Sequence, residues 1–373
     1  MNGLIVVLVA VTTLAVDPTL RFERERIGDV TFEACSMFDV NNDGTTDIVS
    51  GGYWFAGPDF KTPNKIAEIM RVDDYYDSFS DYPMDVNGDG WTDIVSGAWF
   101  GMTMLWRENP GEAGGEWTEH SVKEVGNIER SIYYDLDGDG VVEVIPRTQP
   151  LYIYKLDLDE NGKGKGTFTE TSIPRDGWSH GIGAGDVNGD GRVDLLVDTG
   201  WLEGGKDPFD PDGYTFHGEW NIPAASVPIL VHDVNGDGKN DVIVGKGHDY
   251  GLYWLEQGAE GEWKQHVIES DKSQFHTIEL VDIDNDDELE LITGKRYRAH
   301  NGNDPGAAEP LGLYYYELNG GDFKRVTLDY GPADKTSGTG LYLWIDDIDG
   351  NGWKDILAPG KEGLYLFRNL GRL

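Results

Sequence analysis

The sequence predicts an all-β fold, a seven-bladed β-propeller, and three observations support this prediction. One nine-residue acidic pattern occurs seven times, beginning at Asp39, Asp85, Asp135, Asp186, Asp233, Asp282 and Asp347. Successive copies begin 46 to 65 residues apart, a period typical of propeller blades. Each copy lies between two short β-like runs, and helical periodicity is absent throughout.

The acidic pattern is typical of a calcium loop. Side-chain oxygens stand at positions one, three, five and nine, and glycine usually stands at position six, as in the first part of an EF-hand loop. No helix pattern flanks the copies, so we expect β-turns that hold up to seven structural Ca²⁺ ions. The predicted ligands are Asp39, Asn41, Asp43, Asp47, Asp85, Asn87, Asp89, Asp93, Asp135, Asp137, Asp139, Glu143, Asp186, Asn188, Asp190, Asp194, Asp233, Asn235, Asp237, Asp241, Asp282, Asp284, Asp286, Glu290, Asp347, Asp349, Asn351 and Asp355.

Two copies depart from this pattern. Asp287 replaces glycine at position six of the sixth copy, and Asn351 replaces aspartate at position five of the seventh. We expect these two calcium sites to be weaker or empty. The alternative for all seven copies is an acidic turn that binds no metal.

The strands of one blade are clearest around the fifth acidic loop. We expect strands at residues 226–232, 242–245, 251–256 and 263–268. After the seventh loop the chain has only two further strands, at 355–358 and 364–367. Residues 20–26 form an unassigned strand at the other end of the chain. We expect this N-terminal strand to pair with the last blade and so close the ring without leaving a long exposed edge.

The composition excludes some classes of protein. The 373 residues carry a formal net charge of −38, so no basic stripe is available to bind nucleic acid. The 12 Trp, 18 Tyr and 13 Phe indicate a large packed core rather than disorder. Cys35 is the only cysteine, so no intrachain disulfide can form. We expect bound calcium to stabilise the fold instead.

The start of the chain is typical of a secretory signal peptide. The apolar run at residues 4–16 is too short to span a membrane, and Thr13 and Ala15 form a small-residue cleavage pattern. We therefore expect a signal peptide at 1–15 and a single propeller at 16–373. This predicts a secreted or periplasmic, extracellular protein without a membrane span.

The acidic loops resemble FG-GAP/VCBS-type repeats, as residues 85–95 (DVNGDGWTDIV) illustrate. The resemblance covers essentially all of the chain after residue 15 and implies one calcium ion in each loop. The repeat frame is also loosely similar to the propeller domain of aldos-2-ulose dehydratases, and more loosely to propeller-type polysaccharide lyases. That similarity implies metal-assisted elimination from a sugar at the propeller mouth, but it identifies no catalytic residue.

Strand direction predicts a second site on the face opposite the acidic loops. Residues just before first strands and just after second strands should converge there, around the axis. Six residues before their loops the chain places Glu33, Glu129, His180 and His276. We expect His180 and His276, with Glu129, to bind a transition metal, Zn²⁺ or Mn²⁺ (iron is also compatible), because imidazole and carboxylate suit these ions better than calcium.

Segments that follow second strands supply further candidates for the mouth. The candidate catalytic bases are His300, His248 and Tyr297, and the candidate cations that stabilise an oxyanion are Lys295 and Arg296. These two cations could instead merely pair with the surplus acids. The candidate substrate-binding residues are Glu33 and three tryptophans that could stack on sugar rings or pack between blades, Trp54, Trp99 and Trp201.

These observations favour a secreted, carbohydrate-active lyase or dehydratase that acts on a sugar or keto-sugar with metal assistance. The alternative is a non-catalytic propeller that binds a glycan or a protein, as the resemblance of FG-GAP repeats to integrin heads implies. A third, weaker possibility is glycoside hydrolysis by Glu33 and Glu129.

Overall fold

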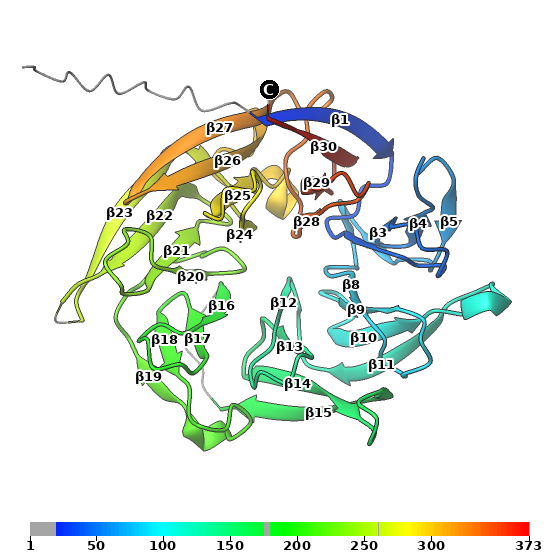
Figure 1. Ribbon diagram of the computed structural model, residues 1–373, viewed down its shortest axis with the longest axis horizontal. Helices are drawn as coiled ribbons and strands as arrows, with labels where there is room; N and C mark the ends of the chain where they lie inside the picture. The colour runs from blue at the N-terminus through cyan, green and yellow to red at the C-terminus, as the bar shows by residue number, and fades with distance from the viewer. Residues whose placement is uncertain (1–19, 175–179, 260, 373) are drawn as a thin grey trace, which may run out of the picture.

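The computed structural model describes residues 20–174, 180–259 and 261–372. Their strands form seven four-stranded antiparallel sheets arranged around a central axis (Figure 1). This architecture confirms the predicted all-β, seven-bladed β-propeller. The predicted signal peptide at 1–15 lies outside the described residues.

Each blade contributes an innermost, a second, a third and an outermost strand. Blade one contains β2 (Ser36–Phe38), β3 (Asp47–Ser50), β4 (Tyr53–Phe55) and β5 (Pro63–Lys65). Blade two contains β8 (Tyr82–Met84), β9 (Asp93–Gly97), β10 (Thr103–Glu108) and β11 (Thr118–Glu124). Blade three contains β12 (Ser131–Tyr134), β13 (Glu143–Pro146), β14 (Leu151–Leu158) and β15 (Gly164–Ile173). Blade four contains β16 (Ile182–Gly185), β17 (Asp194–Val197), β18 (Gly200–Glu203) and β19 (Thr215–His217).

The remaining blades follow the same plan. Blade five contains β20 (Leu230–His232), β21 (Asp241–Gly245), β22 (Tyr250–Gln257) and β23 (Trp263–Ser273). Blade six contains β24 (Ile278–Val281), β25 (Glu290–Gly294), β26 (Leu311–Asn319) and β27 (Asp322–Gly331). Blade seven contains β28 (Trp344–Asp346), β29 (Asp355–Ala358), β30 (Leu364–Arg372) and the N-terminal strand β1 (Leu20–Gly28). A two-stranded ribbon, β6 (Arg71–Val72) and β7 (Tyr75–Tyr76), joins blades one and two.

The N-terminal strand β1 is the outermost strand of blade seven. It pairs antiparallel with β30, with Arg24 opposite Phe367. In blade five the second to fourth strands lie where the sequence predicts them, but β20 begins only at Leu230 rather than at residue 226. Pro228 has no N–H to donate to a neighbouring strand, so regular pairing begins after it.

The hydrophobic core is divided into clusters between neighbouring blades. Leu196 and Trp201 of blade four, for example, pack against Val242 and Val244 of blade five. Because side chains alternate along a strand, each second and third strand faces one neighbouring blade with one set of residues and the other neighbour with the next. The helical elements in the described part of the chain are single 3₁₀ turns, η1 (Gly111–Ala113), η2 (Pro211–Gly213) and η3 (Ala299–Gly302). No helix among these residues has the length and apolar character needed to cross a membrane.

A buried carboxylate at position nine of each acidic loop fastens the strands of its blade together. In all seven loops this carboxylate accepts a hydrogen bond from the backbone N–H at position two. In the five loops where position nine is aspartate, the other oxygen accepts a backbone N–H from the third strand or from just beyond its end. In blade five, Asp241 accepts from Val234 at 3.1 Å and from Gln257 at 2.8 Å. Position nine therefore ties the first strand, the loop and the third strand together.

We predict that Asp241→Ala lowers the melting temperature whether or not calcium is present. The substitution leaves the buried N–H of Val234 and the partly buried N–H of Gln257 without their acceptor, at a cost of about 2 to 4 kcal/mol. Asp237→Ala is the matched control, because Asp237 lies at exposed position five of the same loop. Calorimetry with excess chelator should show a loss for Asp241→Ala and little change for Asp237→Ala. Equal losses would contradict this role of position nine.

Candidate functional site

Residues that precede the innermost strands meet on the axis, at the end of the propeller opposite the acidic loops. Glu129 precedes β12, His180 precedes β16 and His276 precedes β24. One ligand atom from each, together with one from His248 in the turn between β21 and β22, all lie within 4.8 Å of one another. The structure thus brings together the three residues that the sequence singled out as transition-metal ligands, and it adds His248, which was expected to act as a base.

Glu129 is the centre of this cluster. Its Oε2 lies 2.9 Å from His180 Nε2, and its Oε1 lies 3.3 Å from His276 Nε2 and 3.7 Å from His248 Nε2. The three imidazole rings stand nearly perpendicular to one another, at 81° to 89°. Their Nε2 atoms therefore approach one carboxylate from three different directions.

Two of the histidines are held in one orientation by their outer nitrogen. Nδ1 of His180 bonds the carbonyl oxygen of Ala225, and Nδ1 of His248 lies 2.9 Å from Asp304 Oδ2. With the proton on Nδ1, each ring presents the lone pair of Nε2 to the cluster. Such partners are typical of metal-binding histidines. Within the described part of the chain, Nε2 of His248 and both ring nitrogens of His276 are buried without a hydrogen-bond partner.

The charges of the cluster favour metal binding. Burial raises the pKa of Glu129, but His276 and His180 outweigh this effect, so that the pKa of this carboxyl lies well below its usual range. Burial and the nearby Arg296 hold the pKa of His276 well below its ordinary value. An ionised carboxylate beside a neutral imidazole is the state in which these groups bind a metal. The mixed nitrogen and oxygen donors fit Zn²⁺, Mn²⁺ or Fe²⁺ and do not fit the oxygen-only preference of Ca²⁺.

Arg296 joins Glu129 to a second buried carboxylate. Its Nη1 lies 2.6 Å from Glu129 Oε1 and its Nε lies 2.8 Å from Glu33 Oε1. The guanidinium is 1% exposed. Arg296 was expected either to stabilise a substrate oxyanion or to pair with surplus acids; in the structure it is enclosed between two carboxylates, and its contacts orient them. Burial raises the pKa of Glu33, but Arg296 and Lys361 reverse the effect and lower it overall.

Lys361 is a buried amine beside this network. Its Nζ lies 3.7 Å from Glu33 Oε2 and 3.6 Å from the centre of the Tyr75 ring. Burial lowers the pKa of Lys361 to about 8, although Glu33 opposes this shift. Lys361 was not predicted from the sequence; its place just after the second strand β29 was the available clue.

His300 lies on the rim of the mouth, above His248. Its ring stacks on that of His248 with centroids 4.3 Å apart, and its Nδ1 lies 2.8 Å from Asp304 Oδ1. The side chain is 61% exposed. Asp304 thus contacts both histidines, and its position four residues after His300 was the available sequence clue. His300 and Asn301 have positive φ angles, a conformation that costs energy and is enriched at functional sites.

Several predicted mouth residues lie elsewhere. Lys295 points away from the axis, where its Nζ bonds the carbonyl oxygens of Gly306 and Glu309. Tyr297 lines a pocket with Arg298 and Pro332, and this pocket also includes Asn301 and Gly302 of the turn that carries His300. The expected role of Lys295 at the mouth is therefore wrong in position, whereas that of Tyr297 stays a prediction. The reason is that side chains alternate between the two faces of the sheet only within a strand. Beyond the end of the strand, the direction of a side chain cannot be predicted from its position in the sequence.

The three tryptophans expected to stack on sugar have different surroundings. Trp201 is 5% exposed and stacks on His217 between blades four and five, so its predicted place at the mouth is wrong. Trp54 lines a groove that includes residues of the first two acidic loops, and it too lies away from the mouth. Trp99 is half-buried and packs beside Phe79 and Leu341, near the mouth.

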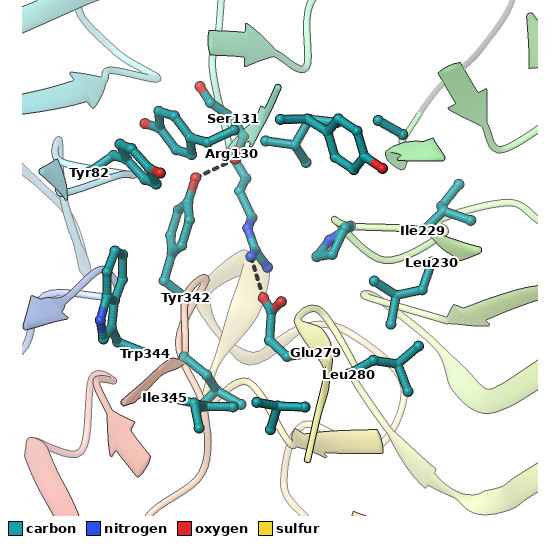
Figure 2. A pocket seen from close by; sticks show the side chains of 17 residues that line it. Tyr82, Arg130, Ser131, Ile229, Leu230, Glu279, Leu280, Tyr342, Trp344 and Ile345 are labelled. Atoms are coloured by element: carbon teal, nitrogen blue, oxygen red, sulfur yellow. Dashed lines mark hydrogen bonds and ion pairs between the residues drawn. The ribbon is translucent and has the colours of Figure 1, made fainter. Parts of the chain in front are cut away.

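A pocket of about 390 Å³ follows the axis below the cluster (Figure 2). Arg130, the residue after Glu129, extends into it and pairs with Glu279 at 2.8 Å. Tyr342 lies against the Arg130 guanidinium at 4.1 Å and bonds the carbonyl oxygen of Ser131. The ion pair occupies the centre of the channel between the histidine cluster and the opposite face.

The acidic loops have the shape and donors of calcium sites. In each loop the first aspartate accepts backbone N–H groups from positions five and six, as in Asp237 and Gly238 bonding Asp233. Three carboxylates lie within 4.8 Å of one another in the third, sixth and seventh loops. Glu143 Oε1 and Asp284 Oδ1 are buried without a hydrogen-bond partner among the described residues. These oxygen-only sets fit calcium.

The loop that lacks glycine keeps the same turn. Asp287 adopts a φ of 71°, close to the 86° of Gly238 in the fifth loop. Cationic side chains pair with carboxylates of the third to seventh loops: Lys155 Nζ is 2.6 Å from Asp139 in the third, for example, and Arg372 is 2.6 Å from Asp284 in the sixth. Any calcium ion in these loops would have to displace these cations from the same carboxylates.

Comparison with known protein families supports the prediction of FG-GAP-type repeats. A family model described as FG-GAP-like repeat matches residues 85–145, 153–197 and 233–293. The chain therefore contains FG-GAP-like repeats, as the acidic loops predict. No curated protein matches the sequence.

Solved structures with similar folds include two lyases. The chain is similar to the exotype rhamnogalacturonan lyase YesX, with 12% identity and a TM-score of 0.49 over 91% of this chain and 72% of that one. For rhamnogalacturonan lyase YesW the values are 12% and 0.47, over 94% and 74% of the two chains. For a protein from Lactobacillus plantarum they are 14% and 0.47, over 80% and 84%.

We predict that removal of calcium lowers the melting temperature. Without a cation, the carboxylates of each loop repel one another at close range. Calorimetry with a calcium-selective chelator should show a lower melting temperature that added Ca²⁺ restores and added Mg²⁺ does not. An unchanged melting temperature would show that the loops are acidic turns without bound calcium.

We also predict a pH-dependent stability that originates from Glu362. Burial raises the pKa of this carboxyl to about 8, although Gly338 N–H donates to it. The folded state keeps a proton that the unfolded chain has released, so stability from this group falls as the pH rises from about 4.5 to about 8. Glu362→Gln should match the wild type near pH 5 and exceed it near pH 9 by about 3 kcal/mol. Exposed Glu112→Gln is the control; an equal difference at both pH values would refute the assignment.

Proposed function

We propose that this propeller with FG-GAP-like repeats is a metal-dependent, carbohydrate-active lyase or dehydratase with its active site at the mouth. The observation that carries the proposal is the cluster of His180, His248, His276 and Glu129, whose ligand atoms converge. Its buried imidazoles include nitrogens that have no hydrogen-bond partner among the residues that the structure describes. The sugar or keto-sugar substrate rests on the resemblance of the repeat frame to the dehydratase propeller.

The residues around the cluster hold and orient the ligands. Ala225 and Asp304 fix the rings of His180 and His248, and Arg296 holds the carboxylate of Glu129. The metal, when bound by this set, supplies Lewis acidity that polarises a carbonyl oxygen of the substrate. Polarisation makes the hydrogen on the neighbouring carbon acidic enough for a histidine to remove.

His300 is the proposed base. Its Nδ1–H donates to Asp304, which leaves the exposed Nε2 as the proton acceptor. In the elimination, Nε2 takes the proton from the carbon beside the carbonyl, the electron pair of that C–H bond forms the C=C bond, and the β-oxygen departs. The imidazolium then returns the proton to this oxygen, which leaves as water or as a sugar hydroxyl. His248 belongs to the ligand set, because its Nε2 faces Glu129.

The geometry argues against direct glycoside hydrolysis by Glu33 and Glu129. Both carboxylates contact the same Arg296 guanidinium, and the pKa of each is lowered by its neighbours. Neither is suited to act as a general acid, which needs a raised pKa. The remaining alternative is a non-catalytic glycan- or protein-binding head. A secreted or periplasmic location, where calcium is available, fits the acidic loops.

We predict that the purified protein contains about one transition-metal ion per chain besides its calcium. His180→Ala/His276→Ala should lose this ion, because it removes two of the proposed ligands, while its calcium content and melting transition persist. Elemental analysis that counts calcium, zinc, manganese and iron separately measures both. His120→Ala is the matched control, since His120 stacks on Trp106 in an outer strand.

Activity is measured on hexopyranosides and their keto derivatives by the ultraviolet absorbance of the unsaturated product. The wild type should form product, and His300→Ala should retain the metal but lose most of the turnover, about 100-fold or more. A protein without transition metal would refute the metal centre. A metal-loaded protein that binds sugars without converting any would favour the binding module.

A further inference from the structure

A groove of about 730 Å³ between blades one and two contains three tryptophans, Trp54, Trp91 and Trp117. All three are half-buried. Asn41 of the first acidic loop lines the same groove, and Trp91 belongs to the second loop. The groove therefore lies towards the face of the acidic loops, away from the histidine cluster.

The other blades show how this position is normally filled. In blades two, four and five a third-strand tryptophan pairs across the sheet with a histidine: Trp106 with His120, Trp201 with His217, and Trp254 with His266. Each imidazole stacks on its indole at 4.2 to 4.3 Å. A glutamate two residues after the tryptophan holds the histidine Nε2 at 2.7 to 3.0 Å.

Blade one has the tryptophan but neither of its partners. Trp54 pairs across the sheet with Asn64, and the residue two positions after it is Ala56. Trp54 stands opposite Val49 of the second strand, as Trp106 stands opposite Val95 in blade two, so the registers are equivalent. Alanine and asparagine thus replace the glutamate and the imidazole. The groove is found where these larger side chains stack in the other three blades.

The walls of the groove suit an uncharged polar ring. Trp117 and Trp91 add two further aromatic side chains to the lining. The amide of Asn64 also lines the groove, and the amides of Asn41 and Asn109 are bonded within the chain. Trp91 packs closely on Gly111, where a Cβ atom would come within 2.9 Å of the indole nitrogen. Lys65 is paired with Glu68 at 2.6 Å, and Glu112 lies on the rim. This setting, on a chain with a net charge of −38, disfavours an anionic ligand.

We infer that this groove binds a neutral oligosaccharide, one sugar ring of which stacks on Trp54 in the place that imidazole takes in blades two, four and five. The C–H face of a pyranose packs on an indole, and its hydroxyls form hydrogen bonds with amides. The site is separate from the mouth and does not depend on the proposed activity. Such a site would bind a polysaccharide without converting it.

The test refills the groove with the residues of the sister blades. Isothermal titration and tryptophan fluorescence measure binding of cellohexaose, laminarihexaose, xylohexaose and mannohexaose. At least one should bind the wild type, and Ala56→Glu/Asn64→His should bind it at least about tenfold more weakly. This variant should fold, because the same pair packs on tryptophan in three other blades. Asn64→Ala, which leaves the groove open, should keep most of the affinity.

A mouth variant separates the two sites. His180→Ala/His276→Ala should bind the same oligosaccharide as tightly as the wild type. The inference is overturned if none of the four oligosaccharides binds, if Ala56→Glu/Asn64→His binds as well as the wild type, or if the mouth variant abolishes binding. Failure of the proposed catalytic function leaves these measurements unaffected, so the two proposals fail separately.

Discussion

The carboxylate at the ninth position of each acidic loop is the interaction on which the fold depends. It is buried in every blade and accepts the backbone N–H at position two. In five blades it also accepts a backbone N–H from the third strand or from just beyond it. A buried carboxylate is stable only when hydrogen bonds or cations compensate its charge. The backbone donors supply part of this compensation. The same residue therefore sets where the first strand ends and where the third strand lies.

The arrangement of the mouth follows from this fixed geometry. Because every innermost strand ends at a clamped loop, the residues before the strands are brought to the other end of the axis at nearly equal heights. Four such positions carry Glu33, Glu129, His180 and His276. Without further partners the two buried carboxylates would repel each other and the buried imidazoles would lack hydrogen-bond partners. Arg296, however, lies between the two carboxylates, and the imidazoles surround Glu129. Because their charges compensate one another away from water, these side chains are held in fixed positions. The network therefore does more than add stability, as a simple salt bridge would.

The sequence predicted the architecture because its repeats are regular, and it predicted the convergence of Glu129, His180 and His276 because strand direction alone fixes it. The sequence could not predict the positions of residues that lie outside the regular strands and repeats. Lys295 and Tyr297 follow a strand end, so no alternation tells which way they point. Asp304 acts from a long insertion, and its contact with both His248 and His300 depends on how that insertion folds back. Trp201 and Trp54 look alike in sequence, and only their cross-strand partners, His217 and Asn64, separate packing from a groove.

The residues of the network around Arg296 come from distant parts of the chain. Glu33 comes from blade one, Glu129 from blade three, His180 from blade four, His248 from blade five, and His276 and Arg296 from blade six. No shorter run of repeats contains this set, so a nascent chain that leaves the ribosome cannot form the centre until its sixth blade has docked. A chain that lacks any of these five blades would therefore retain repeats yet lack part of this set.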